Sequence, residues 1–277
     1  MTGKDDYYNR AKQQGYRARS AYKLQQLDET ADLLDRGATV VDLGAAPGGW
    51  LQVAAERVGP QGTVVGVDRQ RIDPLEDPEA TVEYVRGDMT ESDTRAAIRE
   101  TLGGEGGDHS GDAADSESGD PTDRPVDVVL SDMAPNMTGE YDLDHARSVH
   151  LARQALDVAE SLLAAGGDLA VKVFDGRDLD DLEADVAESF EYVRQVRPDA
   201  SRDASSELYL VGKGYLTAPV RAGEEHEVEI VDEGEEGDGI ARVEGYTLFV
   251  SGAEPGETVR VRVDDVKPNF GFAERVE

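Results

Sequence analysis

Short runs of β-branched residues alternate with helical patterns between Ala38 and Lys213, and this alternation constrains the fold more than any other feature of the sequence. Strands that alternate with helices pair in parallel, and their helices cover both faces of one sheet. We therefore predict an α/β, Rossmann-like domain with a mostly parallel sheet of about seven strands. The predicted strands cover 39–44, 63–68, 82–88, 126–132, 168–174, 192–198 and 207–214, and the predicted helices cover 50–58, 91–102, 144–165 and 178–189.

The pattern changes after Thr217, where short alternating strands are separated by Gly and Asp turns. This pattern predicts a small all-β barrel, similar to an OB-type fold, over 217–277, behind a first domain over 1–214. Inside the first domain, residues 103–123 contain six Gly and seven acidic residues, but no Lys, Arg, Val, Ile, Leu or Phe. Such a segment buries too little apolar surface to offset its ordering entropy, so we predict a disordered surface insertion without a catalytic role.

The net charge has two interpretations. With 28 basic and 60 acidic residues the chain carries a formal charge of −32, which by itself argues against a nucleic-acid partner. The acid excess is spread along both halves of the chain, which favours a protein adapted to molar salt, where charges are screened beyond ~3 Å. We favour this halophilic interpretation, under which local exceptions to the acidity become informative.

Several classes of protein are excluded by composition. The absence of Cys excludes disulfide scaffolds, Cys-ligated zinc and iron–sulfur clusters, and the four His residues have no metal-ligand spacing. No apolar run approaches the ~18 residues of a membrane span, and the N-terminus lacks the apolar stretch of a signal peptide. We expect a soluble, cytoplasmic monomer that binds neither a membrane nor a metal.

Two segments are exceptions to the acidity. Residues 1–23 hold six basic residues against two acidic ones, with Tyr7, Tyr8, Tyr16 and Tyr22 interleaved. Basic groups beside aromatic rings are typical of surfaces that hold a phosphate backbone and stack bases, although a solvated N-terminal arm is the simpler alternative. A second cluster, which could equally be part of a capping domain, contains Arg260, Arg262, Lys267, Phe270 and Phe272.

A glycine-rich segment, Asp42-Leu-Gly-Ala-Ala-Pro-Gly-Gly-Trp50, follows the first predicted strand and opens a helix. Glycines there allow a tight turn and a close approach of backbone to a ligand. Asp68 ends the second strand, where a carboxylate can accept ribose hydroxyls, and Asp88 ends the third, near the expected position of an adenine. Because the dinucleotide spacing G-x-G-x-x-G is absent, we predict an adenosyl cofactor without a pyrophosphate, namely S-adenosylmethionine.

Lys172 lies inside the apolar predicted strand 168–174. A buried ammonium is costly unless it is paired, and Asp132, at the end of the preceding strand, is placed to pair with it. The alternative explanation is that Lys172 lies on an edge strand and that its side chain extends to solvent without a catalytic role. The segment around Asp132 lacks the aromatic that would clamp a flipped base, so the acid and the buried amine favour deprotonation of a hydroxyl.

Five ordered motifs together closely resemble the FtsJ/RrmJ (RlmE) family of ribosomal RNA 2′-O-methyltransferases, over about residues 5–214. They are Arg19-Ser-Ala-Tyr-Lys23-Leu, Val41 to Trp50, Leu130-Ser-Asp132-Met-Ala-Pro-Asn-Met-Thr-Gly139, Val171-Lys172-Val-Phe and Ser205-Ser-Glu207-Leu-Tyr. The resemblance implies a catalytic tetrad of Lys23, Asp132, Lys172 and Glu207. It also implies cofactor contacts at Gly48, Trp50, Asp68, Asp88 and Asp132, and methylation of a uridine in large-subunit (23S) ribosomal RNA, on the assembled 50S subunit.

The C-terminal segments Gly239–Ala253 and Val266–Ala273 resemble a TRAM domain, which implies a small RNA-binding β-barrel. Three alternatives remain open from the sequence. The chain could methylate another RNA such as tRNA, methylate a small hydroxylated molecule, or serve as a non-catalytic RNA-binding or ribosome-assembly protein.

Overall fold

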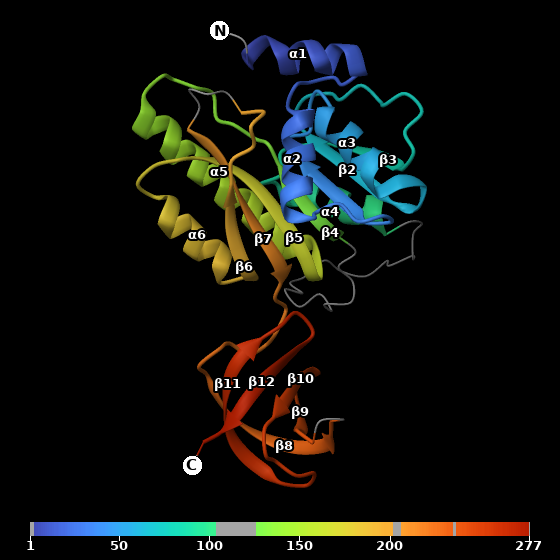
Figure 1. The fold of residues 1–277 in the computed structure, drawn as a ribbon. Coiled ribbons are helices and arrows are strands. Elements are labelled where there is room, and N and C mark those ends of the chain that lie inside the picture. Colours follow the sequence, from blue (N-terminus) through green and yellow to red (C-terminus); the bar gives the residue numbers. More distant parts are fainter. Residues whose placement is uncertain (1–2, 104–125, 202–205, 235–236, 277) are drawn as a thin grey trace.

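The computed structural model describes residues 3–103, 126–201, 206–234 and 237–276 (Figure 1). The predicted acidic insertion, from residue 104 onward, lies outside these residues. No helix of the described chain is long and apolar enough to cross a membrane.

Within the described residues, seven strands form one sheet in the order β3-β2-β1-β4-β5-β7-β6. All neighbours pair in parallel except β7, which is antiparallel to both β5 and β6. The predicted α/β fold with a mostly parallel sheet is thereby confirmed. The strands are β1 (Thr39–Leu43), β2 (Thr63–Asp68), β3 (Thr81–Arg86), β4 (Val126–Ser131), β5 (Leu163–Phe174), β6 (Phe190–Val196) and β7 (Glu207–Tyr215).

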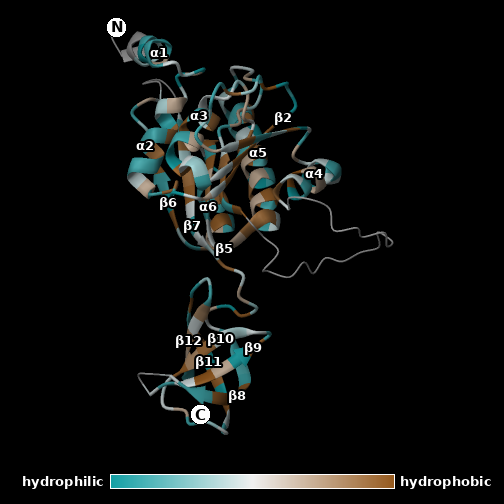
Figure 2. Ribbon diagram, turned by 90° about the vertical axis from the view of Figure 1, so that its right-hand side faces the viewer, coloured by the Kyte–Doolittle hydropathy of each residue, from teal (hydrophilic) through white to brown (hydrophobic). Residues whose placement is uncertain are grey.

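Helices cover both faces of this sheet, and each face has its own apolar core. The helices are α1 (Gly3–Gln14), α2 (Ala21–Ala31), α3 (Gly49–Val58), α4 (Ser92–Leu102), α5 (Tyr141–Leu162) and α6 (Leu179–Ala187), with a 3₁₀ turn over Gly59–Gln61. One core packs under α4, α5 and α6, and the other under α2 and α3. The hydropathy colouring of Figure 2 shows the apolar strands between more polar helices.

The helices α1 and α2 were not among the predicted elements. Leu24, Leu27 and Ala31 recur at helical spacing in α2 and are all buried. The many polar residues around them conceal this short apolar stripe.

Beyond β7, the described chain forms a closed five-stranded barrel in the order β10-β12-β11-β8-β9, which confirms the predicted small all-β fold. Its strands are β8 (Glu225–Glu233), β9 (Gly239–Val243), β10 (Tyr246–Val250), β11 (Thr258–Val266) and β12 (Phe270–Arg275). Alternate residues Val259, Val261 and Val263 point into the barrel core. Figure 1 shows the barrel and α1 at opposite ends of the molecule.

Candidate active site

A cavity of about 610 Å³ opens where the carboxyl ends of β1, β2, β3 and β4 meet. This is the edge at which open α/β sheets bind their ligands. Asp68, Asp88 and Asp132, all predicted from the sequence, lie in its wall. Gly44 and Ala46 of the predicted glycine-rich segment also line it. Lining residues that were not predicted include Thr90, Met133, Pro135, Arg147 and His150.

The glycine loop after β1 brings the backbone close to this cavity. Gly44 has a φ of +77°, and a Cβ there would lie 2.3 Å from Cγ of Met133, so no side chain fits. Gly48, with a φ of +107°, adjoins the guanidinium of Arg17. That guanidinium donates to the carbonyls of Pro47, Asp73 and Pro74 and so braces the loop.

The two predicted adenosine-binding carboxylates are fixed by backbone amides. Asp68 accepts from the Ala46 amide at 3.0 Å and from the Gln70 amide at 2.7 Å. Asp88 accepts from the Thr90 amide at 3.1 Å and from the Thr90 hydroxyl at 2.8 Å. The backbone hydrogen bond from Thr90 makes the largest contribution to lowering the pKa of Asp88, and it keeps this carboxylate charged.

Neither Gly48 nor Trp50 lines the cavity, although both were predicted to contact the cofactor. The Trp50 side chain is buried behind the loop, where its Nε1 donates to the carbonyl of Ser20 at 2.8 Å. Its ring centroid lies 5.7 Å from that of Tyr209. The Trp50 ring therefore anchors α2 and α3 to the sheet, and any contact of these residues with a ligand must come from their backbone.

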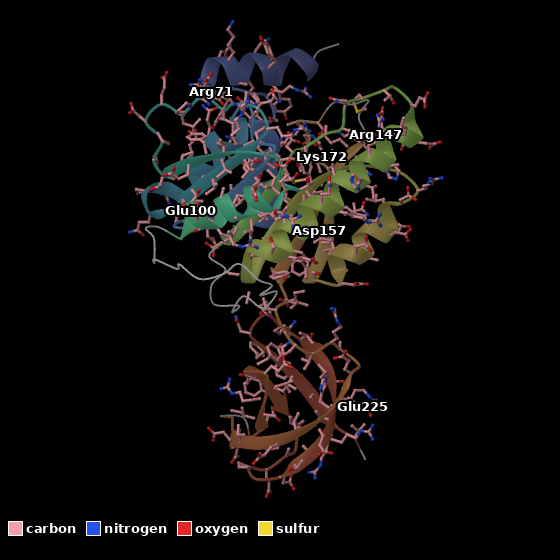
Figure 3. The ribbon with its side chains drawn as sticks, turned by 180° about the vertical axis from the view of Figure 1, so that it is seen from behind. Arg71, Glu100, Arg147, Asp157, Lys172 and Glu225 are labelled. Atoms are coloured by element: carbon pink, nitrogen blue, oxygen red, sulfur yellow. The ribbon has the colours of Figure 1, made fainter. Side chains whose placement is uncertain are left out.

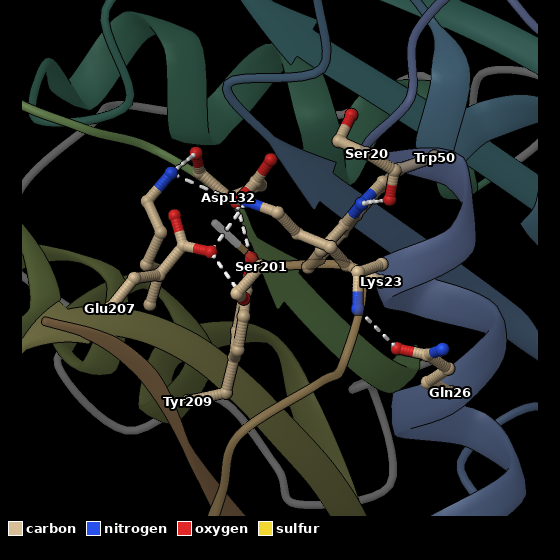
Figure 4. Close-up of polar contacts among 10 residues, drawn as sticks. Ser20, Lys23, Gln26, Trp50, Asp132, Ser201, Glu207 and Tyr209 are labelled. Carbon is tan, nitrogen blue, oxygen red and sulfur yellow. Dashed lines mark hydrogen bonds and ion pairs between the residues drawn. The ribbon is translucent and has the colours of Figure 1, made fainter. Parts of the chain in front are cut away.

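The four residues of the predicted catalytic tetrad converge at Asp132, which also lines the cavity. Figure 4 shows three of them, Lys23, Asp132 and Glu207, together with Tyr209. The amine of Lys172 donates to Oδ1 of Asp132 at 2.9 Å and also to the Asp132 carbonyl. The amine of Lys23 lies 2.6 Å from Oε1 of Glu207 and 3.8 Å from Oδ1 of Asp132. Glu207 Oε1 also accepts from the Ser201 hydroxyl at 2.8 Å.

The tetrad is assembled by the strand order. Lys172 lies on β5, Asp132 directly follows β4, and Glu207 opens β7, while Lys23 comes from α2 across the face of the sheet. The Lys172 and Lys23 side chains are each only 7% exposed, so each ammonium needs a carboxylate close by. Two amines and two carboxylates meet this need with no net charge.

Tyr209 is a fifth member of this network that was not predicted. It pairs in register with Lys172 across β5 and β7, and its hydroxyl donates to Oδ1 of Asp132 at 2.6 Å. Burial, followed by the negative charge of Asp132, raises the pKa of Tyr209 well above its ordinary value. The phenol therefore remains a hydrogen-bond donor that orients Asp132.

Asp42 is a further acid beside the tetrad that was not predicted from the sequence. It is 1% exposed, and its Oδ2 has no hydrogen-bond partner among the described residues. Burial raises its pKa well above the ordinary value, and the charges of Asp132 and Asp68 add to this effect. The position of Asp42 inside the apolar run 39–44 is the signal that could have revealed it.

Of the four tyrosines in the N-terminal segment, Tyr8 is exposed, whereas Tyr7 and Tyr16 are partly buried. Tyr22 is buried, and its ring stacks edge-on with Tyr16 at 5.7 Å. Arg10 lies over the Tyr22 ring at 4.9 Å, and Lys23 belongs to the tetrad. Most of this cluster therefore attaches α1 and α2 to the domain.

The basic cluster of the barrel is also different from the expectation. Arg260 and Arg262 both pair with Glu225, and Lys267 pairs with Glu191 of the first domain at 2.7 Å. Phe270 and Phe272 instead pack around Phe249 and line a hollow with Glu233 and Asp238. The positive charges of this cluster are thus paired with carboxylates. Within the described chain, no group of three or more His, Asp or Glu side chains could hold a metal ion.

Comparisons with known proteins agree with this geometry. Residues 16–215 match the FtsJ-like methyltransferase family and residues 219–276 match the TRAM domain. The chain is 70% identical to the ribosomal RNA large subunit methyltransferase E of Haloarcula marismortui and 64% identical to that of Natronomonas pharaonis, in both cases over the full length of both chains. Both relatives come from halophilic archaea.

Among solved structures, the chain resembles the crystal structure of a putative ribosomal RNA methyltransferase from Plasmodium falciparum, with a TM-score of 0.58 and 25% identity over 72% of this chain and 98% of that one. The family match over residues 16–215 comprises the whole sheet, the cavity and the four converging charged residues. The chain therefore belongs to the FtsJ-like methyltransferase family and carries a C-terminal TRAM domain.

Proposed function

We propose that this protein methylates the 2′-hydroxyl of a uridine in large-subunit ribosomal RNA, with S-adenosylmethionine as methyl donor and the assembled subunit as substrate. The convergence of Lys172, Asp132, Lys23 and Glu207 beside the cavity carries this proposal. The class of RNA is supported by the names of the relatives from Haloarcula marismortui and Natronomonas pharaonis.

The cavity fits the proposed cofactor. Its volume of about 610 Å³ lies in the range of cofactor sites, and the loop at Gly44 leaves room only for backbone. Asp68 would accept the ribose hydroxyls, since each of its oxygens keeps a free lone pair, and Asp88 would accept from the adenine edge. Asp132 would hold the methionine amino group, and Gly48 and Trp50 would act through their backbone. S-adenosylmethionine, when bound, supplies a methyl group made electrophilic by a sulfonium charge.

Lys172 is the proposed proton acceptor. After its ammonium has passed a proton to water, Lys172 would take the proton of the ribose hydroxyl as the oxygen attacks, and the ammonium that forms again would be stabilised by Asp132 at 2.9 Å. Tyr209 would keep the Asp132 carboxylate in position through its hydrogen bond. The proton would later pass from Lys172 to water, which restores the amine.

Lys23 and Glu207 would hold the ribose and its adjoining phosphates. Their pairing at 2.6 Å fixes both side chains in the mouth of the site before RNA arrives. Alignment of the acceptor oxygen with the transferred methyl group would contribute most of the acceleration. Because DNA lacks the reacting hydroxyl, the same chemistry would select RNA.

The experiment is methyl transfer in molar KCl, with radiolabelled S-adenosylmethionine and three substrates: assembled large subunits, protein-free large-subunit RNA, and tRNA. We expect most label in the assembled subunit and a loss of label in the Lys172→Met variant. Preferential labelling of tRNA would contradict the proposed substrate, and RNA binding without any label would favour a non-catalytic protein.

A further inference from the structure

Three large apolar side chains are exposed together where the chain enters α5. Met137 is 62% exposed, Tyr141 is 58% exposed and Leu143 is 39% exposed. Clustered apolar surface of this kind commonly marks a binding site. Met137 lies in the loop before α5, residues 133–140, whereas Tyr141 and Leu143 lie in the first turn of α5. This loop leaves the sheet immediately after Asp132, and its first residues line the cavity.

This loop is held in place by buried hydrogen bonds. The carboxylate of Asp144, which is itself buried, accepts from the Thr138 amide at 2.9 Å, the Thr138 hydroxyl at 2.8 Å and the Gly139 amide at 3.0 Å. The hydroxyl of Tyr141 donates to the carbonyl of Asp175 at 2.6 Å. The exposed ring of Tyr141 is therefore fixed in orientation before any partner binds.

The ring is fixed on the side from which an acceptor nucleotide has to approach. The cavity occupies the β3-β2-β1-β4 half of the sheet edge, so the acceptor must enter from the β5 and β7 side of Asp132. Asp175 lies on that side, because it directly follows the last residue of β5, Phe174, and comes three residues after Lys172. Figure 3 shows Lys172 and Arg147 of α5 near this end of the sheet.

The chemistry around the ring favours a base over a phosphate. Glu140 and Asp142 flank Tyr141 in the sequence, so a phosphate would meet like charge there. Stacking of a base on an aromatic ring does not depend on charge, and it therefore persists at salt concentrations that weaken phosphate contacts.

We propose that Tyr141, assisted by Met137, is a stacking platform for an unpaired base of the substrate RNA, at or next to the methylated nucleotide. This inference rests on the proposed function and adds the residue that holds the nucleotide. The base packs against the exposed face of the ring while the Tyr141 hydroxyl remains bonded to Asp175.

Steady-state kinetics of large-subunit methylation test the platform with three variants. Tyr141→Ala should raise KM for the subunit about tenfold or more and change kcat less than about threefold. Tyr141→Phe, which keeps the ring but loses the hydrogen bond, should stay near the wild type. Tyr192→Ala removes a ring of similar exposure (51%) on β6 and should change neither constant.

Two kinetic results would overturn the proposal. If Tyr141→Phe is as impaired as Tyr141→Ala, the hydroxyl matters and the role is structural. If Tyr141→Ala has the KM of Tyr192→Ala, no base rests on the ring. Thermal unfolding and binding of S-adenosylhomocysteine identify any variant that is misfolded.

Photocrosslinking provides a readout that does not need methyl transfer. Large-subunit RNA that contains 5-iodouridine, irradiated in complex with the protein, should form a crosslink that maps to Tyr141 by mass spectrometry. A crosslink to Tyr141 without methylation would contradict the proposed function but support the stacking role of Tyr141. Methylation with crosslinks only at other residues would contradict the stacking role alone.

Discussion

Replacement of Lys172 by Met removes the proposed proton acceptor and retains most of the side-chain volume. General-base catalysis contributes about 10²–10⁴-fold in rate, which is about 3–5 kcal/mol at 1.36 kcal/mol per tenfold. We therefore expect kcat for 2′-O-methylation to fall by at least about 10²-fold, while the affinity for S-adenosylhomocysteine changes little because Asp68 and Asp88 are untouched.

The same substitution has a calculable effect on stability. It removes the 2.9 Å charge-assisted bond to Asp132, which contributes about 1.5–3 kcal/mol. Asp132 keeps the Tyr209 hydroxyl at 2.6 Å and the Lys23 amine at 3.8 Å. The lost bond to the Asp132 carbonyl adds to this amount, so the free energy of unfolding should fall by up to about 3–5 kcal/mol, which is the cost of breaking a buried ion pair. The variant therefore remains folded.

Lys213→Met is the matched control. Lys213 forms a comparable pair with Asp168 at 2.5 Å, on β7 and at the opposite edge of the sheet from the cavity. The control should lose similar stability, by urea unfolding in molar KCl, but keep its kcat. A Lys172→Met variant within about tenfold of wild-type kcat, or a control with an equal loss of kcat, would refute the reasoning.

Three further predictions concern Lys23, Asp42 and Arg17. Lys23→Met removes the ammonium that neutralises the buried Glu207, so unfolding free energy should fall by about 3–5 kcal/mol, and the double variant Lys23→Met/Glu207→Gln should be more stable than this single variant in urea. Because burial raises the pKa of Asp42, the folded state binds its proton more tightly, and wild-type stability falls as pH rises from the ordinary aspartate range through the raised pKa. Asp42→Asn cannot ionise at this position, so its free energy of unfolding does not fall in this way. The difference in unfolding free energy between variant and wild type should therefore grow with pH, and a difference that stays constant with pH would contradict the prediction. Arg17→Ala removes the hydrogen bonds to the carbonyls of Pro47 and Pro74. The variant should bind S-adenosylhomocysteine severalfold more weakly, as measured by calorimetry. An unchanged affinity would show that the glycine loop does not depend on these bonds.

Much of the fold was predictable because its signals are local. The β-branched runs and the glycine loop indicated the sheet, and the alternating C-terminal strands indicated the barrel. The helices α1 and α2 were missed because tertiary packing of a few apolar residues, such as Leu24 and Leu27, stabilises them within a polar segment.

The site was predictable to a smaller extent. That Lys23 and Glu207 meet could be expected only from the family resemblance, because contacts between distant segments leave no local pattern. Arg17 and Tyr22 were assigned to an RNA-binding surface because of their charge and aromaticity. In the structure the Arg17 guanidinium instead donates to a backbone carbonyl, and the Tyr22 ring is buried. Composition identifies which groups are present, whereas their partners depend on the fold.

The position of the transferred methyl group tests the central claim most directly. A 2′-O-methyl group blocks alkaline cleavage of the adjoining phosphodiester, so large-subunit RNA labelled by this protein should release its label in an alkali-stable dinucleotide with uridine on the 5′ side. The Lys172→Met variant should release almost none. Label recovered in mononucleotides would place the methyl group on a base and would contradict a Lys172 amine that takes its proton from a ribose hydroxyl.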